Sequence, residues 1–200
     1  MEKALQLARD EEDRWREGKC LTWLAVINFE RAEPGATLAN CEELRPLVVR
    51  MGEGGEPPFV LAVEALAHLA LRHPNAARDL EVAVEQLRAF DSKAHLAYIL
   101  NAAAGIAFED GNPMAALEAA KNALVAAEAT RRVCESVVAR SWLARILGAQ
   151  GDPSGSERWL DPIRDLVEKH DDLSARARSA GLLAMEAHGL RVLTLGHTQS

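Results

Sequence analysis

The fold is decided by the stretch Ala107-Phe108-Glu109-Asp110-Gly111-Asn112-Pro113-Met114-Ala115-Ala116-Leu117-Glu118-Ala119-Ala120-Lys121-Asn122-Ala123-Leu124. It predicts the end of one helix, a tight turn at residues 110–113 and the start of a second helix. Gly111 can adopt the left-handed conformation that ends a helix. Pro113 can begin the next helix, because the first turn of a helix leaves its N–H groups unpaired. The stretch therefore indicates a helical hairpin.

Small residues follow this turn at helical spacing. Ala116, Ala120 and Ala123 place three methyl groups on one face of the second helix. A face of small side chains lets a neighbouring helix approach closely. We expect this hairpin to pack tightly against the next one.

Composition favours an all-α protein. The chain has 200 residues, of which 48% are hydrophobic but only 4% aromatic, so alanine, leucine and valine carry the apolar content. That is typical of closely packed helices and unlike a β-sandwich. The net charge is −7, and no basic stripe is visible in the sequence, so we expect no direct nucleic-acid binding.

Cysteine usage and hydropathy suggest a cytoplasmic protein. Cys20, Cys41 and Cys134 are odd in number and form no CxxC pair, which favours free thiols over a disulfide framework or a zinc site. Met1 to Trp15 is charged and amphipathic, unlike a signal peptide. No apolar run reaches the roughly 20 residues that a membrane-spanning helix needs, so we expect no membrane partner.

Apolar periodicity and turn residues predict helices along the whole chain. The first is expected to end at Gly18, and the Gly- and Pro-rich segment 51–58 is expected to be a linker. Pro46 and Pro162 are expected inside returning helices, where proline kinks the backbone. The other helices are expected at residues 21–32, 37–49, 59–72, 76–90, 93–109, 113–130, 133–150, 155–169 and 173–190.

The turns recur at a nearly fixed distance. Gly35, Pro74, Gly111 and Gly151 stand at almost equal intervals along the chain. One more step of the same length reaches Gly189, where we expect the last helix to end. A regular interval of this kind is typical of stacked supersecondary units.

The hairpin resembles the tetratricopeptide repeat, whose pattern has a turn glycine followed by small residues five, nine and twelve positions later. Gly111, Ala116, Ala120 and Ala123 match that pattern. The resemblance implies one α-solenoid domain over residues 1–200, with a period of about 37–40 residues. Its repeats would be 20–56, 57–92, 93–131 and 132–171, with partial hairpins at 1–19 and 172–200.

The long, alanine-rich repeats also resemble the C-terminal arrays of large multidomain bacterial regulators of transcription and signalling. This resemblance implies a non-enzymatic module that binds a protein, a peptide or a small effector. A free-standing scaffold or adaptor is the first alternative. An all-helical small-molecule-binding protein is the second.

In the tetratricopeptide family the first helices of the hairpins line a concave surface that binds ligand peptides. Aligned on the turns, our candidates for that surface are Phe29, Glu64, His68, Arg72, Tyr98, Asn101, Phe108 and Arg145. The aromatic residues would anchor a ligand or belong to the core between helices. The arginines would pair with ligand carboxylates or lie in solvent.

Nothing in the sequence indicates catalysis, a cofactor or a resident metal. The six histidines are scattered, and no HExxH motif is present. Glu64, His68 and Arg72 share a helix face, either as a surface ion-pair stripe or as the rim of a small-molecule pocket. His170-Asp171-Asp172 is better explained by capping of the following helix than by metal binding.

The C-terminal helix carries many apolar residues, which suggests self-association through that end. These residues are Leu182, Leu183, Met185, Leu190, Val192, Leu193 and Leu195.

Overall fold

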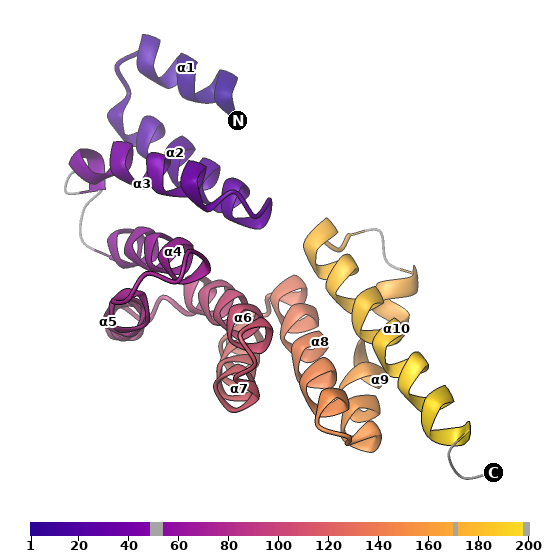
Figure 1. Cartoon of the computed structure of the whole chain (residues 1–200). Coiled ribbons are helices and arrows are strands. Elements are labelled where there is room, and N and C mark those ends of the chain that lie inside the picture. The colour runs from indigo at the N-terminus through magenta and orange to yellow at the C-terminus, as the bar shows by residue number, and fades with distance from the viewer. Residues whose placement is uncertain (49–53, 170–171, 198–200) are drawn as a thin grey trace. The chain divides into compact units, whose positions relative to one another are not determined.

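The structure is a computed structural model that describes residues 1–48, 54–169 and 172–197, the last eight of these by backbone alone. Within these residues the chain forms ten α-helices and no strand (Figure 1), which confirms the all-α prediction. The helices are α1 (Glu2–Asp10), α2 (Arg14–Glu30), α3 (Pro34–Val48), α4 (Glu56–Ala70), α5 (Ala76–Ala89), α6 (Lys93–Glu109), α7 (Pro113–Ala129), α8 (Val133–Ala149), α9 (Pro153–Lys169) and α10 (Ala175–His197).

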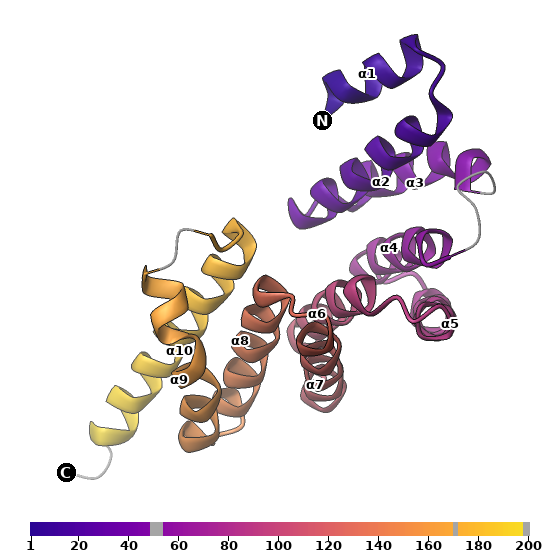
Figure 2. The same cartoon turned by 180° about the vertical axis from the view of Figure 1, so that it is seen from behind.

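The chain divides into two compact units, residues 1–99 and 100–200, with the division inside α6. In unit 1, each of the helices α1 to α5 packs against its neighbour in the chain, and α2 also contacts α4 (Figures 1 and 2). Leu21, Leu44, Leu66 and Leu87, one from each of α2 to α5, are fully buried between these helices.

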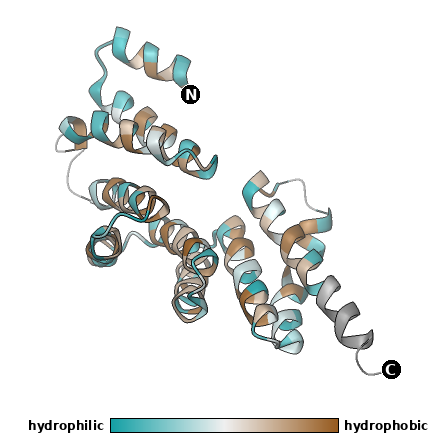
Figure 3. Cartoon of the chain, viewed as in Figure 1, coloured by the Kyte–Doolittle hydropathy of each residue, from teal (hydrophilic) through white to brown (hydrophobic). Residues whose placement is uncertain are grey.

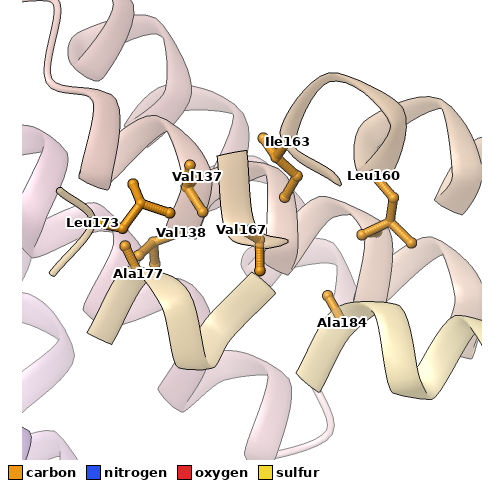
Figure 4. Packing of buried hydrophobic residues seen from close by; sticks show 9 residues of the cluster. Val137, Val138, Leu160, Ile163, Val167, Leu173, Ala177 and Ala184 are labelled. Atoms are coloured by element: carbon orange, nitrogen blue, oxygen red, sulfur yellow. The ribbon is translucent and has the colours of Figure 1, made fainter. Parts of the chain in front are cut away.

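Unit 2 follows the same rule of packing. Helices α7 to α10 contact one another in chain order, and α10 also contacts α8. Figure 4 shows the core between α8, α9 and α10, where Val137, Leu160, Ile163, Val167 and Ala177 meet. In both units a helix therefore contacts its neighbour and a helix two places along the chain.

Among the described residues, seven turns have the same pattern of backbone hydrogen bonds. In the α6–α7 turn, the N–H of Gly111 donates to Phe108 O and the N–H of Asn112 donates to Ala107 O. This is a Schellman motif, which satisfies the last carbonyls of a helix when one residue is left-handed. The same pair of hydrogen bonds recurs with left-handed residues at Glu12, Ala32, Arg72, Asp91, Arg131 and Gly151.

These left-handed positions set the repeat. Successive ones lie about 20 residues apart, except for Ala32 and Arg72, which are separated by about twice that distance. The turns predicted at Gly35 and Pro74 are centred on Ala32 and Arg72 instead. With this correction the hairpin turns at 32, 72, 111 and 151 recur about every 40 residues, more evenly than the sequence alone indicates.

Two predicted helix ends, at Gly18 and Gly189, and one predicted turn, at Gly35, are wrong. Gly18 is buried inside α2, and the chain turns earlier, at Glu12. Gly35 lies in the first turn of α3, because the chain already turns at the left-handed residue Ala32 and the helix begins at Pro34. Gly189 lies inside α10, which continues to His197. In each case the glycine resembles a helix stop, although the neighbouring sequence continues the helix.

Polar residues gather at the turns and hydrophobic residues along the helices (Figure 3). Pro46 and Pro162 lie inside α3 and α9, as predicted. Asn112 and Asp152 begin α7 and α9, and each side chain accepts a hydrogen bond from a backbone N–H three residues on. These are N-caps, which fix where the helix after a turn begins.

Candidate functional site

A pocket of about 520 Å³ opens in unit 1 between α3, α4 and α5. Its walls are largely apolar and include Val60, Leu61 and Val82. Leu61 and Val82 are about half exposed, so they offer apolar surface to a ligand. The volume lies within the usual range for small-molecule and cofactor pockets.

Two of the predicted site residues, Glu64 and His68, line this pocket. The Glu64 carboxylate lies 2.7 Å from Arg45 Nη2 of α3 and 4.0 Å from His68 Nε2, one helix turn further along α4. Only 19% of the Glu64 side chain is exposed. Asp79 of α5 adds a second carboxylate to the lining. The polar side of the pocket therefore carries two carboxylates and one guanidinium, which favours a cationic group on a ligand.

Cys41 also lines the pocket, and its surroundings keep it a thiol. Burial, assisted by the nearby Glu64 carboxylate and opposed by Arg45, raises the pKa of the Cys41 thiol to about 12. A thiolate is the nucleophilic form of cysteine. Cys41 therefore supplies apolar surface at neutral pH and no nucleophile.

Unit 2 brings together two other predicted residues, Phe108 and Arg145. The Arg145 guanidinium lies 5.3 Å from the Phe108 ring centroid and 4.5 Å from that of Trp142. Gly105 of α6 makes room for this cluster, because a Cβ there would lie 2.8 Å from Trp142 Cζ2. Burial lowers the pKa of the Arg145 guanidinium, and Glu109 opposes that shift. The guanidinium lies within cation–π distance of both rings, whose centroids are 6.0 Å apart.

Asn101 takes part in packing within unit 2. The residue is 1% exposed, and its Nδ2 donates to the Glu135 backbone O at 3.0 Å and to Glu135 Oε2 at 2.8 Å. Arg176 of α10 bonds the other oxygen of the same carboxylate. These bonds tie α6, α8 and α10 together through one partly buried acid.

The other predicted residues occupy separate positions in unit 1. Phe29 is half-buried near the end of α2. Arg72 is the left-handed residue after α4 and is exposed, outside the pocket lining. The Tyr98 ring contacts Phe59 edge-on, with ring centroids 6.0 Å apart. Within unit 1, then, only Glu64 and His68 of the predicted set share a pocket.

Sequence reasoning missed Arg45 and Asp79. Both follow from helix faces: Arg45 lies four residues after Cys41 on α3, and Asp79 lies four before Ala83 on α5. What the sequence does not give is which faces of α3 and α5 meet α4.

Within the described residues, no group of three or more His, Cys, Asp and Glu side chains could hold a metal ion. The predicted capping segment at His170 and Asp171 lies outside the described residues. No described helix has the length and apolar character needed to cross a membrane. The comparisons add no family: no family model, no curated protein and no solved structure matches the chain.

Proposed function

We propose that this chain is a non-enzymatic helical-repeat module of the tetratricopeptide type that binds a peptide, a protein or a small effector. The observation that carries the proposal is the pocket between α3, α4 and α5, with Glu64 held between Arg45 and His68. The recurrence of the turns, and the contacts of α2 with α4 and of α8 with α10, support the repeat assignment.

The pocket defines the chemistry of the bound group. Apolar walls accept an aliphatic chain, and the carboxylates of Glu64 and Asp79 outnumber the guanidinium of Arg45. An aliphatic chain that ends in a cation satisfies both features, whether it is a lysine side chain of a partner peptide or a small amine. The acidic charge of the whole chain favours such a ligand during encounter.

Titration with hexylammonium, followed by backbone amide NMR, tests this proposal. We expect saturable shifts at Leu61 and Val82, and affinity about tenfold weaker in Glu64→Gln because a charge-assisted contact is lost. Glu81→Gln is the matched control, because Glu81 is an exposed carboxylate of α5 outside the pocket lining. Equal binding of neutral hexanol, or an unchanged affinity in Glu64→Gln, would contradict the proposal.

We further propose, on the resemblance alone, that the module is part of a larger bacterial regulator of transcription or signalling. Its binding event would then change the orientation of a neighbouring switch domain. The domain content of the full reading frame tests this step: a nucleotide-binding domain upstream supports it, and a reading frame holding these 200 residues alone favours a free-standing scaffold.

A further inference from the structure

A second pocket lies in unit 2, between α7, α8 and α9, and has a volume of about 360 Å³. It occupies the same kind of place as the pocket of unit 1, where one helix is flanked by the helix before it and the helix after it. Ala127, Val137 and Ile163 form its floor and are at most 2% exposed. The floor is therefore apolar and almost fully buried.

The polar lining of this pocket differs in charge from that of unit 1. Arg131, Arg132 and Arg140 line it together with a single carboxylate, that of Glu128. An excess of guanidinium groups around an apolar floor is unusual in a chain whose net charge is −7. The pocket therefore favours a negatively charged ligand, whereas the acidic chain as a whole attracts positively charged ones.

Arg140 and Glu128 satisfy each other. Arg140 Nη2 donates to Glu128 Oε1 at 2.7 Å, and the Arg140 guanidinium lies 5.6 Å from the Trp159 ring centroid. The Arg140 side chain is 20% exposed. These contacts hold the Arg140 side chain in place, and the ion pair neutralises the charge of the Glu128 carboxylate.

Arg131 and Arg132 are left without such a partner. The structure pairs neither guanidinium with a carboxylate among the described residues. The Schellman turn after α7 brings both residues to the pocket, since Arg131 is its left-handed residue and Arg132 precedes α8 directly. Two forked donors thus lie beside the apolar floor, ready to bind a carboxylate.

We propose that this pocket binds an aliphatic carboxylate. The aliphatic chain lies on Pro162 and Leu166, which line the pocket and keep exposed apolar surface, and the carboxylate accepts hydrogen bonds from Arg131 and Arg132. This site is separate from the pocket of unit 1 and does not rest on the function proposed for it. Free fatty acids and the acidic side chains or C-terminus of a peptide share this chemistry.

The test titrates the full chain with octanoate and, as a neutral control, octanamide, using calorimetry and amide NMR. We expect octanoate to bind with shifts at Ser136 and Leu166, and octanamide to bind at least about tenfold more weakly, because it offers the arginines no charge. Octanamide binding as tightly as octanoate, or octanoate failing to bind, would overturn the proposal.

Val133 allows a charge test within the pocket. It lines the pocket, is 52% exposed and begins α8, where an acidic side chain is compatible with the helix N-terminus. Val133→Asp is expected to abolish octanoate binding by repulsion, whereas the nearly isosteric Val133→Asn retains it within about threefold. Equal affinities of the two variants would contradict the assigned position of the carboxylate.

The arginines are tested with a matched pair of double variants. Arg131→Gln with Arg132→Gln should weaken octanoate binding about tenfold or more. Arg31→Gln with Arg78→Gln removes two exposed arginines from unit 1 and should leave the affinity unchanged. If both double variants weaken binding equally, the effect is one of net charge and the site is refuted.

A second titration, with a peptide, distinguishes a free fatty acid from a carboxylate of a partner protein. Acetyl-Asp-Asp-Leu-Asp-amide, compared with its asparagine counterpart, measures binding of a carboxylate that belongs to a protein. Tighter binding of the acidic peptide than of octanoate identifies a protein partner, and the reverse order identifies a free aliphatic acid. Binding of the asparagine peptide as tight as that of the acidic one would again overturn the proposal.

Discussion

Five of the described left-handed residues carry side chains, although this backbone conformation favours glycine. Ala32, with φ of 58°, is one of them. We expect Ala32→Gly to stabilise unit 1 by about 1 kcal/mol, because it relieves the clash of Cβ with the neighbouring carbonyl. The reverse change, Gly111→Ala at φ of 73°, should cost about the same. Urea denaturation curves measure both.

The control for Ala32→Gly is the same replacement inside a helix. Ala36 is exposed in α3 of the same unit, where glycine lowers stability by roughly 0.5–1 kcal/mol. The two Ala-to-Gly changes should therefore shift the midpoint in opposite directions. A destabilising Ala32→Gly would show that the turn at residues 31–33 carries no strain.

Glu17 gives a prediction for pH. Its side chain is 8% exposed and accepts hydrogen bonds from Arg14 and Arg9 at 2.8 and 3.0 Å. These contacts, that with Arg14 foremost, lower the pKa of the Glu17 carboxyl in the folded state, although burial opposes the shift. A lowered folded-state pKa means that this stabilisation is present above the unfolded-state pKa and is lost as the pH falls through the folded-state pKa.

We therefore expect Glu17→Gln to lower stability by about 1–2 kcal/mol at pH 7 and by much less in acid. Thermal unfolding of the variant and the parent between pH 7 and pH 3 measures the difference. Glu42→Gln, which removes an exposed carboxylate of α3, is the control and should have little effect at any pH. A Glu17→Gln effect that persists unchanged in acid would rule out the charge as its cause.

At the scale of the helix, two of the glycines of α10, Gly181 and Gly189, have opposite surroundings. A Cβ on Gly181 would overlap Cγ2 of Val167, a stiff side chain that is 1% exposed. A Cβ on Gly189 would meet nothing within 4 Å. We expect Gly181→Ala to destabilise unit 2 by about 1–3 kcal/mol through overpacking. We expect Gly189→Ala to stabilise the helix by up to about 1 kcal/mol.

Near-ultraviolet circular dichroism during denaturation reports on both glycine variants, because Trp142 and Trp159 pack against the core of unit 2. Both glycines lie inside the same helix, so a difference in helix propensity cannot explain opposite signs. A neutral Gly181→Ala would mean that α9 and α10 pack less closely at Val167 than the structure describes.

The helices themselves were largely predictable because their apolar periodicity is strong. The limits of α7 follow directly from Gly111 and Pro113, and the structure confirms them to within a residue or two. The errors at Gly18 and Gly35 arise because the nearby left-handed residue is not a glycine, whereas Gly189 is a glycine inside a continuous helix. Ala32 and Glu12 have no sequence signal for that conformation, because the backbone hydrogen bonds of the turn, and not the side chain, impose it.

At the scale of the whole molecule, an apolar surface on α10 predicts self-association. Leu182 and Leu183 are each 50% exposed, and Met185 packs partly against the core of unit 2. The predicted contributions of Leu190, Val192, Leu193 and Leu195 lie outside the described side chains. We expect a second copy of the chain to cover Leu182 and Leu183.

Light scattering after size-exclusion chromatography tests this prediction. The mass of the parent chain should rise with concentration, and Leu182→Gln with Leu183→Gln should hold it at the mass of a single chain. Leu7→Gln, at a residue of unit 1 that is 56% exposed, is the matched control and should associate as the parent does. A parent chain that stays monomeric at every concentration would contradict the prediction.

The candidate sites were less predictable than the helices, because a pocket depends on which faces of three helices meet. Glu64 and His68 were found through their shared helix face, a local property. Arg45 belongs to a different helix, α3. Arg131 lies in a turn whose sequence does not differ from that of an ordinary charged loop. The spacing of residues within one helix can be read from the sequence, whereas the helix faces that meet between α3 and α4 cannot.

The Schellman turns have a consequence for how such a chain can change over generations. The turn is closed by backbone groups alone, so glutamate, alanine, arginine, aspartate and glycine all serve at the same position. Substitutions there leave the spacing between turns intact, and duplication or deletion of one hairpin adds or removes about 40 residues without altering the rule of packing. Proteins descended from one ancestral gene could thus differ in length by whole hairpins and have low sequence identity, while every turn kept the same backbone hydrogen bonds.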